Sequence, residues 1–447
     1  MASRRICLWI LFMIVAQVVG EDTQSMIMSL MVDSKFQCAN TTCLPFINVF
    51  TSNIMNCQVA CLTQSQCRAA TFHRLTSNCE LFDNMLNQNG SILADVDAIS
   101  MNVISGTRFP SDQITSTTTS SSTSTTTTTT VCSLPSQSSW SQNATTIFGS
   151  QAGTSGSNLT LLSGPIGMYY DGYSNMLFVA DSGNQRILQF SVDNPLSVAT
   201  VIAGSNGQGC NMNQFILPNG IGVDSFNQLY VSDYSCNQVV IFPSNSNSTT
   251  FGILLGSIAL AASISIRQSG INDDIYAVSY NDNSVYKFYG GSGSAVVAAG
   301  GNGNGNALNQ LSDPTGVYYD YLYTNSLYVA DSGNHRVLKF PSGSTNATYG
   351  TVVAGDNGAG SGANQLNNPR SIIVDSSGTL YIADANNNRI QRWLQNASNG
   401  TTIVGGTQGA ASDQLYSPET VLFDKYGNLL VSDRYNNRIQ MFNLTIC

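Results

Sequence analysis

The chain has 447 residues, of which 42% are hydrophobic and 10% are charged, and its formal net charge is −9 at pH 7. This composition argues against a disordered chain and leaves room for two or three folded domains. The negative charge, with no run of Lys and Arg, argues against a nucleic-acid partner, which needs clustered positive charge to neutralise phosphates.

Residues 1–20 have the features of a secretory signal peptide. A pair of arginines precedes the apolar run 6–15 and Val-Val-Gly ends the segment, so we predict cleavage after Gly20. An uncleaved anchor is the alternative, although about 15 apolar residues are fewer than the ~20 of a membrane-spanning helix. The later run Leu254–Ile266 is shorter and is read as a buried strand. We therefore expect a secreted, extracellular protein without a transmembrane span.

The cysteines support an oxidising compartment. Loss of Cys7 with the signal peptide leaves ten of the 11 cysteines, an even number, as a set of disulfides requires. The first set is Cys38, Cys43, Cys57, Cys61, Cys67 and Cys79, and the second is Cys132, Cys210, Cys236 and Cys447. Clustered cysteines can also hold a metal, but neither a Cys-x2-Cys motif nor a close pair of histidines accompanies them. We expect no metal and no cofactor.

The first set has a recognisable spacing. The chain reads Cys57-x3-Cys61-x5-Cys67-Arg-Ala-Ala-Thr-Phe, and Cys79-Glu-Leu follows. This pattern resembles the core of the Apple/PAN module. The resemblance implies a small, disulfide-rich α+β domain over residues 36–105.

The pairing of these cysteines is only partly indicated. The spacing puts Cys57 and Cys61 one helical turn apart on a short helix near residues 54–63. The resemblance implies the pairs Cys57–Cys79 and Cys61–Cys67. The partners of Cys38 and Cys43 stay open, because spacing alone allows 15 pairings of six cysteines.

Residues 107–131 are the expected linker, since residues 115–130 are all Thr or Ser. Such a segment has no apolar area to bury, so we predict an extended, O-glycosylated stalk. Sequons for N-glycosylation also fit a secreted chain. They lie at Asn40, Asn89, Asn143, Asn158, Asn247, Asn346, Asn396, Asn399 and Asn443.

From residue 132 to residue 447 the chain is a repeat array. An apolar run ends in an Asp at Asp181, Asp233, Asp331, Asp384 and Asp433, and a degenerate copy ends at Ser279. A period near 50 residues with several β-rich runs per unit is typical of a propeller. In the fourth unit the four predicted strands are Gly316–Asp320, Leu327–Asp331, Arg336–Phe340 and Thr351–Gly355.

One motif of these repeats reads Asn-His-Arg-Val-Leu at 334–338 and Asn-Asn-Arg-Ile-Gln at 387–391. It resembles the NHL repeat family. The resemblance implies a mainly β fold, a six-bladed propeller over residues 132–447. Propellers of this kind serve as binding platforms and, in a minority, as lyases.

The array begins with the fourth-strand-like Thr145–Gly149 and ends with a third-strand copy, Arg438–Phe442. We predict that the first of these completes the sixth blade and covers two open sheet edges. Cys132 and Cys447 would then meet at the seam and form a disulfide. Topology also predicts the pair Cys210–Cys236, because a blade's entry loop and the turn after its second strand lie on one face.

The repeated Asp residues have two interpretations. A ring of carboxylates could bind a cation or a substrate, but an Asp that ends a strand commonly accepts backbone hydrogen bonds in the following turn, which we favour. The arginines that recur in register, at 186, 336, 389 and 438, point to the same structural role.

Enzymatic motifs are sparse. Amidating lyases with a propeller of this family hold zinc with three histidines, whereas this chain has only His73 and His335. The sequence has no G-x-S-x-G motif and no Cys–His pair in a recognisable context. We assign no catalytic residue.

Four sequons lie between the third and fourth strands of their units, so we predict that sugars crowd one face of the disc and that a ligand binds the opposite face. On that face the two residues after the repeat position are small or polar in three units and carry Tyr or Arg in the others. Tyr and Arg are enriched at binding hot spots. The candidates are Tyr234, Tyr280, Arg434 and Tyr435.

These observations predict a secreted or cell-surface recognition or adhesion protein. It would bind an extracellular protein or carbohydrate through the propeller and the Apple-like module. The alternative is a secreted propeller enzyme, a lyase or a hydrolase that uses a cation in the central channel.

Overall fold

The structure is a computed structural model. It describes the backbone of five strands between residues 28 and 103, and residues 138–446 except 173, 195–197, 268–272 and 292. The chain divides into two compact units, Met1–Thr126 and Thr127–Cys447. No helix in the described residues has both the length and the apolar character to cross a membrane. The predicted signal peptide and Ser/Thr linker lie outside these residues.

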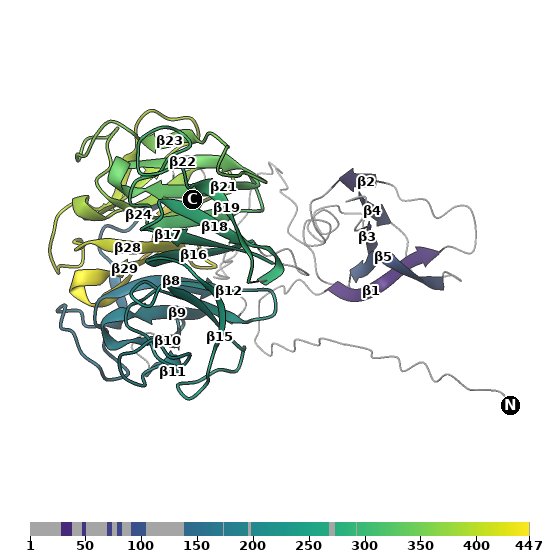
Figure 1. The fold of residues 1–447 in the computed structure, drawn as a ribbon, viewed down its shortest axis with the longest axis horizontal. Coiled ribbons are helices and arrows are strands. Elements are labelled where there is room, and N and C mark those ends of the chain that lie inside the picture. Colours follow the sequence, from purple (N-terminus) through teal and green to yellow (C-terminus); the bar gives the residue numbers. More distant parts are fainter. Residues whose placement is uncertain are drawn as a thin grey trace, which may run out of the picture. The chain divides into compact units, whose positions relative to one another are not determined.

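The first unit contains a five-stranded antiparallel sheet (Figure 1). Its strands are β1 (Met28–Gln37), β2 (Ile47–Phe50), β3 (Ala69–His73), β4 (Asn78–Phe82) and β5 (Ser91–Val103). The order across the sheet is β1-β5-β3-β4-β2. Cys79 lies on β4, whereas the predicted helix near 54–63 and the other five cysteines of the first set lie outside the described residues. The predicted cysteine pairs of this unit remain predictions.

The second unit is a propeller of six four-stranded antiparallel blades. Blade 1 is β8 (Pro165–Asp171), β9 (Met176–Asp181), β10 (Arg186–Ser191) and β11 (Thr200–Gly204); blade 2 is β12 (Pro218–Val223), β13 (Leu229–Asp233), β14 (Gln238–Phe242) and β15 (Ile253–Ser257); blade 3 is β16 (Ala261–Arg267), β17 (Asp274–Ser279), β18 (Ser284–Phe288) and β19 (Ala295–Gly300). Blade 4 is β20 (Gly316–Asp320), β21 (Ser326–Asp331), β22 (Arg336–Pro341) and β23 (Thr351–Gly355); blade 5 is β24 (Pro369–Val374), β25 (Leu380–Asp384), β26 (Arg389–Trp393) and β27 (Thr401–Gly405); blade 6 is β28 (Pro418–Phe423), β29 (Leu429–Asp433), β30 (Arg438–Phe442) and β7 (Thr145–Gly149).

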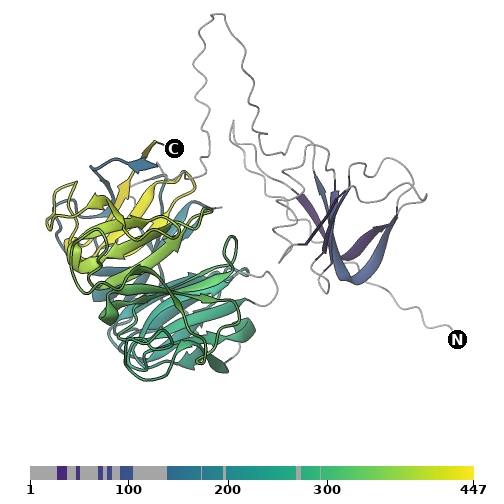
Figure 2. The ribbon, with the colours of Figure 1, turned by 90° about the horizontal axis from the view of Figure 1, so that it is seen from above.

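The ring closes as the sequence predicts, because β7 pairs with β30 as the fourth strand of blade 6. A second pairing follows at the same seam, between β6 (Ser139–Trp140) and β31 (Leu444–Ile446). Figure 2 shows this C-terminal strand beside the start of the propeller. Ile446 pairs with Ser139, but Cys132 and Cys447 lie outside the described residues, so their disulfide stays a prediction.

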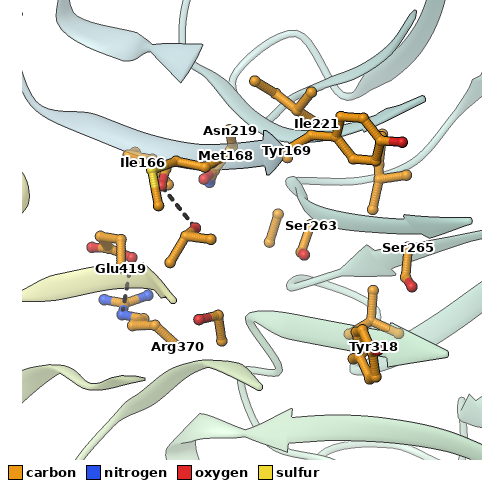
Figure 3. Close-up of a pocket in the computed structure, with 18 of the residues that line it drawn as sticks. Ile166, Met168, Tyr169, Asn219, Ile221, Ser263, Ser265, Tyr318, Arg370 and Glu419 are labelled. Atoms are coloured by element: carbon orange, nitrogen blue, oxygen red, sulfur yellow. Dashed lines mark hydrogen bonds and ion pairs between the residues drawn. The ribbon is translucent and has the colours of Figure 1, made fainter. Parts of the chain in front are cut away.

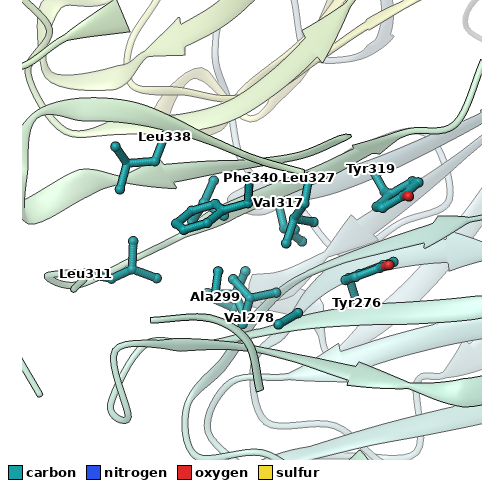
Figure 4. Close-up of a cluster of buried hydrophobic side chains, with 13 residues drawn as sticks. Tyr276, Val278, Ala299, Leu311, Val317, Tyr319, Leu327, Leu338 and Phe340 are labelled. Carbon is teal, nitrogen blue, oxygen red and sulfur yellow. The ribbon is translucent and has the colours of Figure 1, made fainter. Parts of the chain in front are cut away.

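The strands are apolar on both faces because each blade packs between two others. Between blades 3 and 4, Val278 and Ala299 meet Leu327 and Phe340, and all four side chains are buried (Figure 4). Burial of each of the three larger side chains stabilises the fold by about 1.5–3 kcal/mol. This packing fixes the first strand of every blade around the axis.

The repeated Asp and Arg form a buried clamp, so their role is structural, but the backbone N–H that the Asp accepts in the clamped blades lies in the preceding connection and not, as predicted, in the following turn. In blade 4 the Asp331 carboxylate accepts hydrogen bonds from the Ser312 N–H at 2.7 Å, from Asn334 at 2.8 Å and from Arg336 Nε at 2.7 Å. Arg336 also donates to three backbone carbonyls between residues 306 and 310. Burial raises the pKa of Asp331, and these hydrogen bonds oppose the shift.

The clamp holds what we call the long connection, the segment that leads from the fourth strand of one blade to the first strand of the next. The same Asp–Arg ion pair occurs as Asp181–Arg186 at 2.7 Å, Asp384–Arg389 at 2.7 Å and Asp433–Arg438 at 2.8 Å. Blade 3 has Ser279 and Ser284 at these positions, and only residues 258–260 lead into it. The degenerate repeat therefore coincides with a connection too short to need a clamp.

The sequons do not segregate to one face as cleanly as predicted. Asn247, Asn346, Asn396 and Asn399 do lie between third and fourth strands and are exposed. However, these loops bond to the long connections at the outer edge of the blades. The Asn302 side chain donates to the Asn346 carbonyl at 2.6 Å, and the Gly350 N–H donates to the Leu308 carbonyl at 2.8 Å. The sequons thus lie at the rim of the disc, where the predicted glycan face and the long connections meet.

Candidate functional site at the mouth of the central channel

The first strands of the six blades enclose a central cavity of about 510 Å³ (Figure 3). Gly220 and Gly222 contribute to its wall, and small hydroxyl side chains from β16, β24 and β28 complete it. At Gly220 a Cβ would lie 2.6 Å from the Ile264 nitrogen, so a larger residue does not fit between β12 and β16. Close approach of the inner strands therefore leaves a narrow channel with a polar middle.

Two serine hydroxyls in this channel have unused donors, whereas Thr420 Oγ1 donates to the Ile166 carbonyl at 2.8 Å. Ser265 Oγ accepts the Tyr319 N–H at 2.9 Å, and Ser371 Oγ accepts the Val421 N–H at 3.0 Å, which ties neighbouring inner strands together. Within the described residues neither hydroxyl donates a hydrogen bond to the protein, and Ser263 lines the same wall. The channel therefore offers O–H groups to an acceptor-rich ligand.

Charged side chains gather at one end, where the first strands of blades 5 and 6 begin. Glu419, whose side chain is 5% exposed, accepts a hydrogen bond from Arg434 Nη1 at 2.7 Å. Arg370 Nε lies 3.6 Å from the other carboxylate oxygen. These are the charged residues among the described side chains that line the channel, and the charge of Asp313 also acts on Tyr234 and Tyr280 at this end.

Arg370 is the less engaged of the two arginines. Its guanidinium forms no hydrogen bond within the described residues, and its Nε is buried without a hydrogen-bond partner. Arg434 is held by Glu419 and lies with its guanidinium carbon 5.2 Å from the centre of the Tyr435 ring. Because Nε is buried and faces Glu419, the donors of Arg370 that a ligand acceptor can reach are its two terminal nitrogens.

Two tyrosines stand at the same end. The rings of Tyr234 and Tyr280 have centroids 5.9 Å apart at an interplanar angle of 67°. Burial raises the pKa of both hydroxyls, Asp313 acts in the same direction on both, and the charge of Arg370 opposes the shift on both. We call Tyr234, Tyr280, Arg370, Glu419 and Arg434 the channel mouth.

The far end of the channel is aromatic. Tyr319 stacks on Tyr276 with ring centroids 4.8 Å apart. Phe423 is covered by Trp140, whose ring lies 6.1 Å away in a stacked arrangement. The two ends of the channel therefore differ in chemistry, and the polar chemistry is at the mouth.

Three of the four predicted ligand residues meet at this site. Tyr234, Tyr280 and Arg434 line the channel. Tyr435 lies outside it, 53% exposed, with its ring centroid 4.9 Å from that of Tyr416. The prediction of a ligand at these residues is not tested by their positions, but the fold does bring them to one end of one cavity.

Sequence reasoning missed Arg370 and Glu419. Each follows the proline that opens its first strand, Pro369 or Pro418. At the same register the other proline-led blades have Ile166, Asn219 and Thr315. Comparing this single position across the repeats would have found a charged pair that departs from the symmetry of the ring.

A cation site has little to build on in the described residues, which contain no group of three or more His, Cys, Asp or Glu that could hold a metal ion. The repeat aspartates are buried in their clamps, and the carboxylate of the channel lies between two arginines.

Comparison with protein families finds two matches. The NHL repeat model matches residues 311–340 and 366–393, and the PAN domain model matches residues 41–106. None of the curated proteins matches the chain. The PAN domain and the Cys210–Cys236 disulfide are features typical of extracellular proteins.

Among solved structures, a structural genomics protein of unknown function from Bacteroides thetaiotaomicron is 12% identical, with a TM-score of 0.53 over 85% of this chain and 91% of its own. An auxiliary nutrient binding protein from the same species is 15% identical, with a TM-score of 0.51 over 69% of this chain and 77% of its own. An auxiliary nutrient binding protein from Bacteroides ovatus is 11% identical, with a TM-score of 0.52 over 85% of this chain and 91% of its own.

At these identities the solved structures show a likeness of fold alone. Together with the family matches and the six closed sheets, they establish the architecture. This chain carries NHL repeats in a six-bladed β-propeller, preceded by a PAN domain.

Proposed function

We propose that this chain is a secreted recognition protein whose propeller binds an extracellular ligand at the channel mouth. The observation that carries the proposal is a break in symmetry. Five blades repeat a buried Asp, whereas Arg370, Glu419 and the tyrosine pair occur once each around the ring and converge on one cavity. A structural feature such as the buried Asp recurs in most blades, whereas a ligand site does not need to recur.

Burial and chemistry support the same location. The mouth combines two half-buried tyrosines with an arginine that has unused donors, and Tyr and Arg are the residues most enriched at binding hot spots. Two of the similar solved structures are named auxiliary nutrient binding proteins, and these names support a ligand-binding function for this propeller. The PAN domain is proposed as a second contact for a protein or carbohydrate.

The test measures which extracellular molecules are captured by the full chain and by two variants of it. The mouth variant is Tyr234→Ala and Tyr280→Ala together with Tyr435→Ala, whose ring lies outside the channel and beside Arg434 of the mouth. The control variant is Tyr289→Ala, Tyr323→Ala and Tyr349→Ala, which removes three exposed tyrosines away from the mouth. We expect the mouth variant to lose the captured ligand and the control to retain it. Undiminished capture by the mouth variant would contradict the proposal.

A further inference from the structure

We infer that the channel mouth is a carboxylate site and that the ligand it accepts is an acidic sugar anchored by Arg370. This inference rests on the proposed function and specifies its ligand.

The charges at the channel mouth favour an anion at Arg370. The chain as a whole carries a formal net charge of −9, yet the channel lining has two arginines and one glutamate, and the rest of the described lining is uncharged. The charge of Asp313 also reaches this end, where it acts on Tyr234 and Tyr280. Glu419 holds Arg434 at 2.7 Å, so Arg370 is the cationic group that a ligand anion can pair with.

The guanidinium of Arg370 is placed to bind a carboxylate. Arg434 Nη1 lies 2.7 Å from one carboxylate oxygen of Glu419. Arg370 Nε lies farther from the other oxygen, at 3.6 Å. The two terminal nitrogens of Arg370 make no hydrogen bond within the described residues. The edge of a guanidinium matches the two oxygens of a carboxylate, and such bidentate pairs are the strong charge-assisted hydrogen bonds.

The channel wall beyond Arg370 suits a ligand that carries many hydrogen-bond acceptors. Beyond Arg370 the wall presents the O–H groups of Ser263, Ser265 and Ser371, two of which already accept backbone N–H groups and so are left with a donor. The protonated hydroxyls of Tyr234 and Tyr280 add two more polar groups beside aromatic faces. An acceptor-rich, ring-sized ligand suits this wall better than an aliphatic acid.

Size points the same way. A cavity of about 510 Å³ falls in the range of small-molecule sites and cannot admit a folded partner. A single sugar ring or a short oligosaccharide end fits it. The acidic side chain of a peptide is the competing source of a carboxylate, so an acidic peptide is one of the probes in the experiment.

The experiment measures binding to the full chain by calorimetry at low and at high salt. The probes are glucuronate, galacturonate and N-acetylneuraminate, each with its methyl ester, and a short peptide rich in Asp and Glu. The ester keeps the ring and removes only the charge. We expect at least one acid to bind about tenfold or more tightly than its ester, and less tightly at high salt.

The variants are Arg370→Gln and, as a matched control, Arg267→Gln. The two arginine side chains are similarly exposed, 26% and 30%, and each has an acidic partner, but Arg267 does not line the channel. Arg370→Gln should weaken binding of the acid about tenfold and leave the ester unchanged. Arg267→Gln should leave both unchanged, and thermal unfolding of both variants checks that each is folded.

Three results would overturn the inference: no binding of any acid, equal binding of acid and ester, or binding of the peptide alone. If, in any of these cases, capture of extracellular material still depends on Tyr234, Tyr280 and Tyr435, then the proposed function stands and only the ligand assignment fails. If that dependence is missing too, both are wrong.

Discussion

Cys236 of blade 2 occupies the position that Asn334 has in the clamp of blade 4, and its disulfide to Cys210 takes the place of a clamp in blade 2. In blade 4 the equivalent residue, Asn334, donates to the carbonyl of Gly305 in the long connection. Blade 2 has Gln238 where the clamped blades have Arg, and Asp233 has no ion pair with any residue that the structure describes. A covalent link with an Sγ–Sγ distance of 2.09 Å therefore fastens the connection that polar contacts fasten elsewhere.

This substitution predicts that the disulfide and the clamp are interchangeable. Changing Cys210→Ser and Cys236→Ser should lower the free energy of unfolding by up to about 3.5 kcal/mol, since the bond closes a loop with a sequence separation of 26. A third protein carries Cys210→Ser, Cys236→Asn and Gln238→Arg, which rebuild the clamp. It should recover a good part of the lost free energy of unfolding. Urea unfolding of the three proteins measures both effects. A rescued variant no more stable than the double serine variant would refute the equivalence.

The buried ion pairs predict a large cost for breaking one of them. Arg336→Met leaves the Asp331 carboxylate buried and releases three backbone carbonyls of the long connection. We expect a loss of about 3–5 kcal/mol in urea unfolding. Arg267→Met removes a partly exposed pair, at 3.2 Å from Asp274, and should cost less than about 1 kcal/mol. Similar losses for the two variants would contradict the clamp.

The tyrosines predict how stability depends on alkaline pH. Burial raises the pKa of Tyr170 from 10.0 to about 12, and burial with a nearby Asp raises those of Tyr230 and Tyr381. Above about pH 10 the unfolded chain loses these protons while the folded chain keeps them. The stabilisation is therefore complete below pH ~10 and is lost as pH rises through the folded pKa, by about 1.4 kcal/mol per unit for each tyrosine.

Urea unfolding between about pH 9 and about pH 11 measures this slope. Tyr230 donates to Asp224 at 3.1 Å, so Tyr230→Phe should make the slope shallower. Tyr289 is 55% exposed, and Tyr289→Phe serves as the control with an unchanged slope. A free energy of unfolding that rises with pH in this range would contradict the predicted decrease.

The seam predicts a second disulfide, between Cys132 and Cys447. Ile446 is paired with Ser139, so the last residue of the chain follows directly from a strand that lies against the start of the propeller. Peptide mapping without reduction should recover one peptide that contains both cysteines. Recovery of Cys132 joined to any cysteine between residues 38 and 79 would contradict it.

Local patterns were sufficient to predict the blades, their strands and the closing strand, because turn residues and apolar runs repeat with the fold. The turns show why: His335 and Asn388 both have a positive φ, at 55° and 53°, where polar residues such as Asn are tolerated. The NHL motif thus records a backbone requirement. A repeated requirement of this kind is visible in one sequence.

The channel mouth was only partly predictable, for the opposite reason. Arg370 and Glu419 come from different blades and are almost 50 residues apart, and nothing local shows that Arg370 points toward the same cavity as Tyr234 and Tyr280. Likewise, the rim contacts of Asn346 depend on how loops of neighbouring segments pack. Side chains that meet across a ring do not recur at a fixed spacing in the sequence, so their contact cannot be predicted from a repeat pattern.

The pairing of β7 with β30 also sets an order of events during synthesis. Thr146 and Gln440, which share a hydrogen bond in this pair, are separated by 294 residues. The ribosome therefore releases β7 long before its partner exists, and the nascent chain carries an unpaired strand until the last blade emerges. Thr145 at its start is exposed, while Ile147 and Phe148 are fully buried once the ring is shut. A chaperone that shields a short β segment would be most needed in that interval.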